Sequence, residues 1–129
     1  MDTFTILFLI GAALILPLMI YIATNRAEVG SPLIAGALSV AFGLFTLFTI
    51  MREGLEQVVF NHNINFWGTQ VWYDLLMAVT VALFFVVPRA RAAGMSIVPW
   101  VVFVALTASV GLLAMVARLF WLERQSQQA

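Results

Sequence analysis

Ionisable side chains gather in one stretch of this sequence, between two long apolar runs. Glu53 and Glu56 lie one helical turn apart, His62 is the only histidine of the chain, and Asp74 stands near the start of the next apolar run. Carboxylates that share a poorly solvated place have their pKa values pushed apart, which is the arrangement that general acid–base catalysis uses. A histidine beside them could carry protons. These residues are the candidates for chemistry.

Amide, aromatic and guanidinium side chains complete the candidate site. Trp67, Trp72, Tyr73 and Trp121 could wall a lipophilic ligand, but tryptophans also gather at the headgroup level of membranes without any ligand. The charged residues allow a purely structural reading too, because near the end of an apolar run they can pair or extend toward water. The candidates for a ligand site or polar cluster are Glu53, Glu56, Asn61, His62, Asn65, Trp67, Gln70, Trp72, Asp74 and Arg118.

Several other chemistries are excluded by composition. One histidine and no cysteine cannot supply the usual transition-metal ligand sets, and the chain has no lysine for a Schiff base. We therefore expect no metal site, and no cofactor is indicated. The net charge is zero and no basic run is present, so the sequence does not predict nucleic-acid binding.

Composition places the chain in a membrane. Hydrophobic residues make up 64% of it, charged residues 9%, and the mean hydropathy is +1.06. A soluble domain of this size could not bury so much apolar surface. Runs of about 20 apolar residues are long enough to cross a bilayer as helices. We expect an all-α, up-down-up-down four-helix membrane bundle, a single transmembrane domain over residues 1–129, with spans at about 4–24, 32–52, 70–87 and 97–122 and a polar loop at 53–69.

Residues at the ends of the runs indicate where helices begin and end. Ser31 followed by Pro32 predicts a capped helix start with proline at the first helical position. Pro88 is predicted to end the third helix, and Ser96 to cap the fourth. The first run could also be a signal peptide, but Met1–Thr3 lacks the positive charge that such a segment carries, so we expect a span.

Helical spacing predicts which faces pack and which charges meet. Ala35, Ser39 and Gly43 recur every four residues on the second helix, and small residues at this spacing allow helices to approach closely. A matching stripe of Thr107, Gly111, Ala114 and Arg118 lies on the expected fourth helix. In an alternating bundle, the end of the second helix, the start of the third and the end of the fourth meet at one membrane face. We therefore expect Glu53, Glu56, Asp74 and Arg118 to converge, with Asp74 and Arg118 forming an ion pair.

Membrane orientation is weakly marked, because the chain has no lysine and only six arginines. In the alternating bundle, three arginines fall on each side: Arg26, Arg89 and Arg91 on one, Arg52, Arg118 and Arg124 on the other. Arg89 and Arg91 form the densest short loop, which by the positive-inside rule favours a cytoplasmic position. Both termini and the His62 loop would then lie outside.

The second half of the chain contains the segments Asn61-His62, Asn65, Trp67-Gly68, Gln70-Val71-Trp72, Asp74-Leu75-Leu76, Pro88-Arg89-Ala90-Arg91, Gly94-Met95, Gly111-Leu112-Leu113-Ala114 and Arg118-Leu119. In these segments the chain resembles small four-helix membrane proteins of bacteria that have no assigned activity. The resemblance implies a four-helix fold and a bacterial inner membrane, and it brings no activity.

Three functional readings follow from the sequence. The favoured one is a non-enzymatic membrane protein, either an accessory subunit or a lipophile-binding module, surrounded by membrane lipid and packed as a homo-oligomer or in a larger membrane complex. The second is a membrane enzyme that uses Glu53, Glu56, His62 and Asp74 on an isoprenoid, quinone or lipid. The third is an oligomeric small transporter, against which stands the absence of a charged residue at the centre of any expected span.

Overall fold

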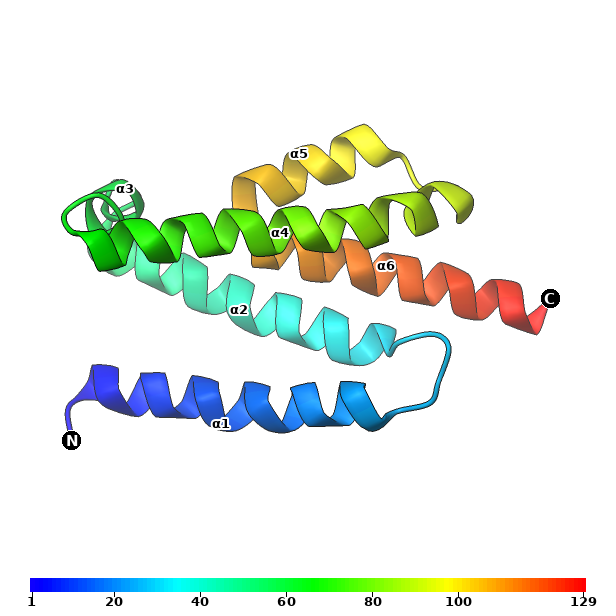
Figure 1. The fold of residues 1–129 in the computed structure, drawn as a ribbon, viewed down its shortest axis with the longest axis horizontal. Coiled ribbons are helices and arrows are strands. Elements are labelled where there is room, and N and C mark those ends of the chain that lie inside the picture. The colour runs from blue at the N-terminus through cyan, green and yellow to red at the C-terminus, as the bar shows by residue number, and fades with distance from the viewer.

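The computed structural model describes residues 1–129 and is entirely helical, which confirms the predicted all-α class (Figure 1). Six helices follow one another along the chain. They are α1 (Thr3–Thr24), α2 (Pro32–Glu53), α3 (Gln57–Asn61), α4 (Phe66–Ala92), α5 (Ile97–Thr107) and α6 (Ser109–Gln128).

Three helices, α1, α2 and α4, are long and apolar enough to cross a membrane. They hold 22, 22 and 27 residues, and a rise of about 1.5 Å per residue makes each longer than a hydrocarbon core of roughly 30 Å. Only nine of the 129 residues are buried, and the accessible surface is 9685 Å², where a soluble protein of this mass would expose about 6,800 Å². The protein therefore needs lipid or another apolar partner over most of its surface, and it is a membrane-embedded protein.

Side-chain caps determine where the long helices begin. The Ser31 hydroxyl accepts a hydrogen bond from the Ile34 backbone N–H at 3.2 Å, with Pro32 at the first helical position, as the sequence predicted. The Asn65 side chain accepts from the Gly68 N–H at 2.7 Å and starts α4 at Phe66, four residues earlier than expected. The expected loop 53–69 consequently shrinks and also contains the short helix α3.

The predicted end of the third span at Pro88 is wrong, because α4 continues through this proline to Ala92. A proline inside a helix removes one backbone hydrogen bond. Packing offsets that loss here, since Ala90 is fully buried in the core and Val86 and Val87 pack against the same cluster. The turn that follows has Gly94 at φ 81°, and the Met95 N–H donates to the Ala90 carbonyl at 2.9 Å.

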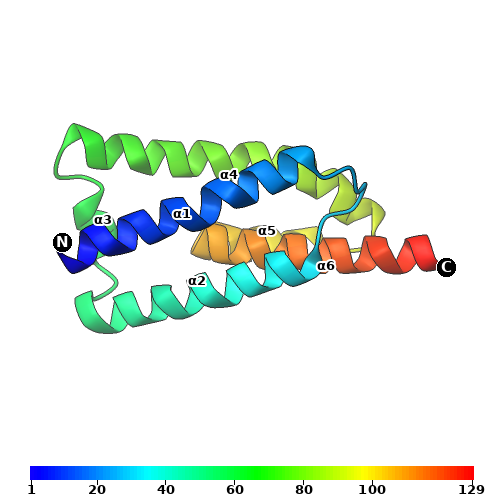
Figure 2. The same cartoon turned by 90° about the horizontal axis from the view of Figure 1, so that it is seen from below.

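The expected single span at 97–122 is also wrong, because the chain folds back at Ala108. This residue has φ 52° and ψ −116°, and it lies between the end of α5 and the start of α6. The two helices run in opposite directions in Figure 1, and they overlap along the same line in the turned view of Figure 2. With only 11 residues, α5 is about 16 Å long and reaches roughly halfway through a hydrocarbon core. The fourth element is thus a helical hairpin, and the structure is not a bundle of four full spans.

Burial explains why the chain folds back. The core consists of Ala90, Met95, Val104, Met115 and Leu119, which come from α4, the turn after it, α5 and α6. A continuous helix would carry Val104 away from Met115 and Leu119. Gly111 permits the close approach of the two helices, since a Cβ atom at this position would lie 2.9 Å from the Phe103 carbonyl oxygen.

The small-residue face of α2 packs against α6, which confirms its predicted role. Ala35 and Ser39 are the buried residues of α2, and the Ser39 hydroxyl donates to the Val110 carbonyl at 2.8 Å. A Cβ atom on Gly43 would lie 3.6 Å from Val110 Cγ1. The matching stripe is only partly as expected, because the atoms nearest to a Cβ atom on Gly111 belong to Thr107 and Phe103 of its own hairpin.

The hairpin changes the position of the C-terminus. Gly30 lies against Phe120 while Gly43 lies against Val110, so α2 and α6 run antiparallel and α6 ends where α2 begins. The N-terminus lies at the opposite end of the molecule (Figure 1). The expectation that both termini share one side is therefore wrong, since the fold-back adds one reversal of direction.

Candidate ligand-binding cavity at the arginine-rich end

The structure brings together only part of the predicted polar cluster. His62 and Trp72 stack with their ring centroids 5.5 Å apart, and His62 Nδ1 lies 2.6 Å from the Val58 carbonyl oxygen. Because a carbonyl only accepts, this nitrogen carries the proton. The Thr69 hydroxyl donates to the His62 carbonyl at 3.1 Å. These bonds fix the connection between α3 and α4, and Asn65 serves there as the cap of α4.

The acidic residues of the cluster are exposed and form no ion pair. Glu53 ends α2, Glu56 precedes α3, and Asp74 lies on α4 nearest to the same end of the molecule. Asn61, Trp67 and Gln70 are exposed as well. The acid–base hypothesis requires carboxylates that are buried close together, so that each shifts the pKa of the other. These exposed carboxylates do not meet that requirement.

Arg118 does not join this cluster, and the predicted pair with Asp74 is absent. Its neighbours in α6, Ala117 and Phe120, lie against Gly36 near the beginning of α2 and against Gly30 just before that helix. Asp74 lies toward the end where α2 finishes. The Arg118 guanidinium carbon instead lies 4.7 Å from the centre of the Trp121 ring. The expectation is wrong because the fold-back sends α6 in the opposite direction.

Charges of opposite sign are consequently separated along the molecule. We call the end that holds the connection between α1 and α2 and the C-terminus the arginine-rich end, because it carries Arg26, Arg89, Arg91, Arg118 and Arg124 with only Glu28 and Glu123. The other end, which we call the acidic end, carries Asp2, Glu53, Glu56 and Asp74 with only Arg52. The sequence predicted three arginines at each end, whereas the structure has five at the arginine-rich end and one at the acidic end.

An ion pair joins the helices at the arginine-rich end. Arg89 donates from Nε to Glu123 Oε1 at 2.9 Å and from Nη2 to Oε2 at 2.6 Å. The Arg89 guanidinium carbon also lies 5.6 Å from the centre of the Phe120 ring. A bidentate contact of this kind fixes the plane of the guanidinium group, and it holds the end of α4 against α6.

Beside this ion pair lies a cavity of about 340 Å³ between α1, α2 and α6. Its volume falls within the range of roughly 300–1,000 Å³ that is typical of small-molecule sites. Apolar side chains form its body: Leu18, Ile22, Ile34, Ala35, Leu38, Leu113, Val116 and Phe120. Polar residues line its outer part: Tyr21, Asn25, Glu28, Ser31 and Arg89. The cavity therefore has an apolar interior and a polar rim.

The polar rim leaves hydrogen-bond donors free. The Tyr21 hydroxyl accepts from Asn25 Nδ2 at 3.1 Å, and the Ser31 hydroxyl accepts from the Ile34 N–H. Neither hydroxyl donates to a protein atom. Asn25 Oδ1 accepts from the Ala27 N–H at 3.0 Å, which fixes the start of the connection between α1 and α2. The rim can thus donate to a ligand without breaking a bond that the protein already makes.

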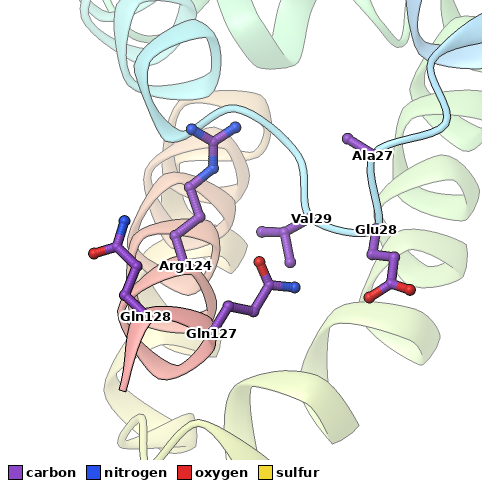
Figure 3. Close-up of a pocket in the computed structure, with 6 residues that line it drawn as sticks. All are labelled: Ala27, Glu28, Val29, Arg124, Gln127 and Gln128. Carbon is purple, nitrogen blue, oxygen red and sulfur yellow. The ribbon is translucent and has the colours of Figure 1, made fainter.

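A second hollow of about 430 Å³ lies outside the first, between the 25–31 connection and the end of α6 (Figure 3). It is lined by Ala27, Glu28, Val29, Arg124, Gln127 and Gln128. Only two of these residues are hydrophobic, so this hollow suits water better than a lipophile. The inner cavity is the better candidate for ligand binding.

Sequence reasoning placed the candidate site at the wrong end for this cavity. Its lining comes from α1, the 25–31 connection, α2, Arg89 of α4 and α6, and α6 reaches this end only because the chain folds back at Ala108. The polar residues Tyr21, Asn25 and Glu28 near the first helix end were the one visible signal.

Fold and cavity together define a helical, membrane-embedded protein with an amphipathic cavity near one end of its long helices. Comparison with protein-family models, with curated proteins and with solved structures gives no match to this chain.

Proposed function

We propose that this chain is a non-enzymatic protein of the bacterial inner membrane that binds one lipophilic molecule in the cavity between α1, α2 and α6. The observation that carries the proposal is the apolar cavity with free donors at its rim. Ligand sites commonly combine a mostly apolar lining with a few polar groups that orient the ligand. The proposal corresponds to the lipophile-binding reading of the sequence and moves its site to the arginine-rich end.

The charge distribution supports one orientation in that membrane. Five of the six arginines lie at the arginine-rich end, and the positive-inside rule places such an end in the cytoplasm. The cavity would then open near the cytoplasmic leaflet, with the N-terminus and the His62 connection outside.

A role as an accessory subunit or homo-oligomer is compatible with this function. No residue of α1 is buried, although it is the most apolar of the three long helices. Its outer face would lie against lipid or a helix of a partner. The alternative of an acid–base enzyme has less support, because Glu53, Glu56 and Asp74 are exposed and unpaired.

Native mass spectrometry of the gently solubilised protein tests the proposal. We expect one ligand mass per chain, lost when the cavity is filled by Leu38→Trp or Val116→Trp. Matched controls on the exposed face of α2, Leu44→Trp and Val40→Trp, should retain it, because these side chains are 63% and 64% exposed and do not line the cavity. A wild type without a retained ligand, or equal retention in all four variants, would show that the cavity does not bind one.

A further inference from the structure

The donors at the rim of the cavity suit an anionic group that only accepts hydrogen bonds. An arginine has five N–H donors, and Arg89 uses two of them on Glu123, which leaves three without an acceptor in the protein. The hydroxyls of Tyr21 and Ser31 are also free to donate. A phosphodiester offers acceptor oxygens alone, and arginine forks match its geometry.

The rim also contains a carboxylate that lacks a partner. Glu28 lines the cavity and is exposed, and it forms no ion pair. Figure 3 shows its carboxylate directed away from Arg124. Since Glu123 neutralises Arg89, the rim itself does not carry the positive surplus of the arginine-rich end. Glu28 would repel a purely anionic headgroup, whereas it would attract the ammonium of a headgroup that carries one.

The depth of the rim matches that of a lipid headgroup. It lies where α1 ends at Thr24 and α2 begins at Pro32, while Leu18, Leu38 and Leu113 line the cavity further along the helices. An acyl chain in the apolar body would therefore place a headgroup at Arg89 and Glu28.

We infer that the ligand is an aminophospholipid. Its phosphodiester accepts hydrogen bonds from Arg89, Tyr21 and Ser31, and its primary ammonium pairs with Glu28. This inference rests on the proposed function and specifies the ligand of that same site.

Lipid competition in nanodiscs tests the inference. The protein is placed in bilayers of equal parts phosphatidylethanolamine and phosphatidylglycerol, released into the gas phase, and the retained lipid is identified by mass. We expect wild type to retain phosphatidylethanolamine over phosphatidylglycerol by about threefold, which is the size of preference that an exposed ion pair supports. Glu28→Gln should bring the ratio close to one, and Glu56→Gln at the acidic end should leave it as in wild type.

A second variant examines the phosphate contact. Arg89→Gln combined with Glu123→Gln removes the ion pair without leaving a lone charge, and it should lower total lipid retention for both headgroups. The Leu38→Trp variant gives the level of lipid retention that remains when the cavity is filled. Unchanged preference in Glu28→Gln, or no preference in wild type, would overturn the aminophospholipid while leaving lipid binding intact. Equal retention by wild type and Leu38→Trp would overturn the proposed function itself.

Discussion

Arg89 at the end of α4 and Glu123 on α6 form a bidentate ion pair, with N–O distances of 2.9 and 2.6 Å. This pair requires that residue 123 lie at the same end of the molecule as residue 89. A single helix over 97–122 would carry Glu123 to the opposite face of the membrane. The ion pair can therefore form only if the chain folds back at Ala108.

The first prediction concerns the energy of this pair. Arg89→Gln and Glu123→Gln should each destabilise the protein, and the double variant should be more stable than the sum of the two losses predicts. Because the side chains are 45% and 20% exposed, we expect a coupling of about 0.5–1 kcal/mol. Unfolding in mixed micelles provides the four free energies. The matched cycle of Asp74→Asn with Arg118→Gln should be additive, and coupling there would indicate that the sequence-based pair was right.

Membrane topology gives the sharpest test of the fold-back. Reporter fusions after Asn25, Gly94 and Gln128 should all report one compartment, the cytoplasm, and a fusion after Gln57 should report the other. The reason is that α6 ends beside the connection between α1 and α2. Should Gln128 instead match Gln57, residues 97–122 cross the membrane as one helix and the hairpin is absent.

Backbone strain at Ala108 predicts that replacing this residue by glycine stabilises the protein. Its φ of 52° and ψ of −116° favour glycine, and a non-glycine residue there costs about 1–3 kcal/mol. Ala108→Gly should therefore stabilise the protein by about 1 kcal/mol after the entropic cost of glycine, which is about 0.5–1 kcal/mol. Ala105→Gly, in the helical part of α5, should destabilise it. Thermal unfolding of both variants measures these changes in stability. Destabilisation by both would indicate that the helix is continuous through Ala108.

The close packing of α2 on α6 predicts unequal effects at two glycines. Gly43→Leu would place a large side chain against Val110 and should cost about 1–3 kcal/mol, whereas Gly43→Ala should be tolerated, because its Cβ atom would make an ordinary contact at 3.6 Å. On α1, a Cβ atom added to Gly11 would meet no atom within 4 Å beyond its two chain neighbours and the backbone of its own helix, so Gly11→Leu should leave stability unchanged or raise it. Equal losses at both positions, measured by thermal unfolding in detergent, would mean that α2 does not contact α6.

The N-terminal cap of α1 carries the pH prediction. Hydrogen bonds from the Thr5 backbone N–H at 2.9 Å and the Thr5 hydroxyl at 2.7 Å hold the pKa of Asp2 below its ordinary value of 3.8. A carboxyl with a lowered pKa in the folded state stabilises the fold above its unfolded pKa, and this contribution is lost as the pH falls through the folded pKa. Thr5→Ala should raise the pKa of Asp2 in an NMR titration, whereas Thr3→Ala should not. An Asp2 pKa that Thr5→Ala leaves unchanged would contradict the hydrogen bond from the Thr5 hydroxyl, since alanine keeps the backbone N–H that caps the helix.

Much of the local structure was predictable, because its causes lie within a few residues. The cap at Ser31 with Pro32 needs only a short sequence, and the start of α2 was placed correctly. The face formed by Ala35, Ser39 and Gly43 follows from helical periodicity and was correctly assigned to packing. Pro88 shows the limit of such reasoning, since burial of Ala90 kept α4 intact beyond a residue that usually ends a helix.

The sequence by itself determined that the chain is helical and belongs in a membrane, because apolar runs of spanning length allow no other solvent. Only the tertiary structure decided where Arg118, Arg124 and the C-terminus lie, and with them the cavity beside Arg89. The break falls at Ala108, a position where the sequence has neither a glycine nor a proline. It is stabilised by burial of Val104 against Met115 and Leu119, and contacts between side chains this far apart in the chain leave no trace in local periodicity.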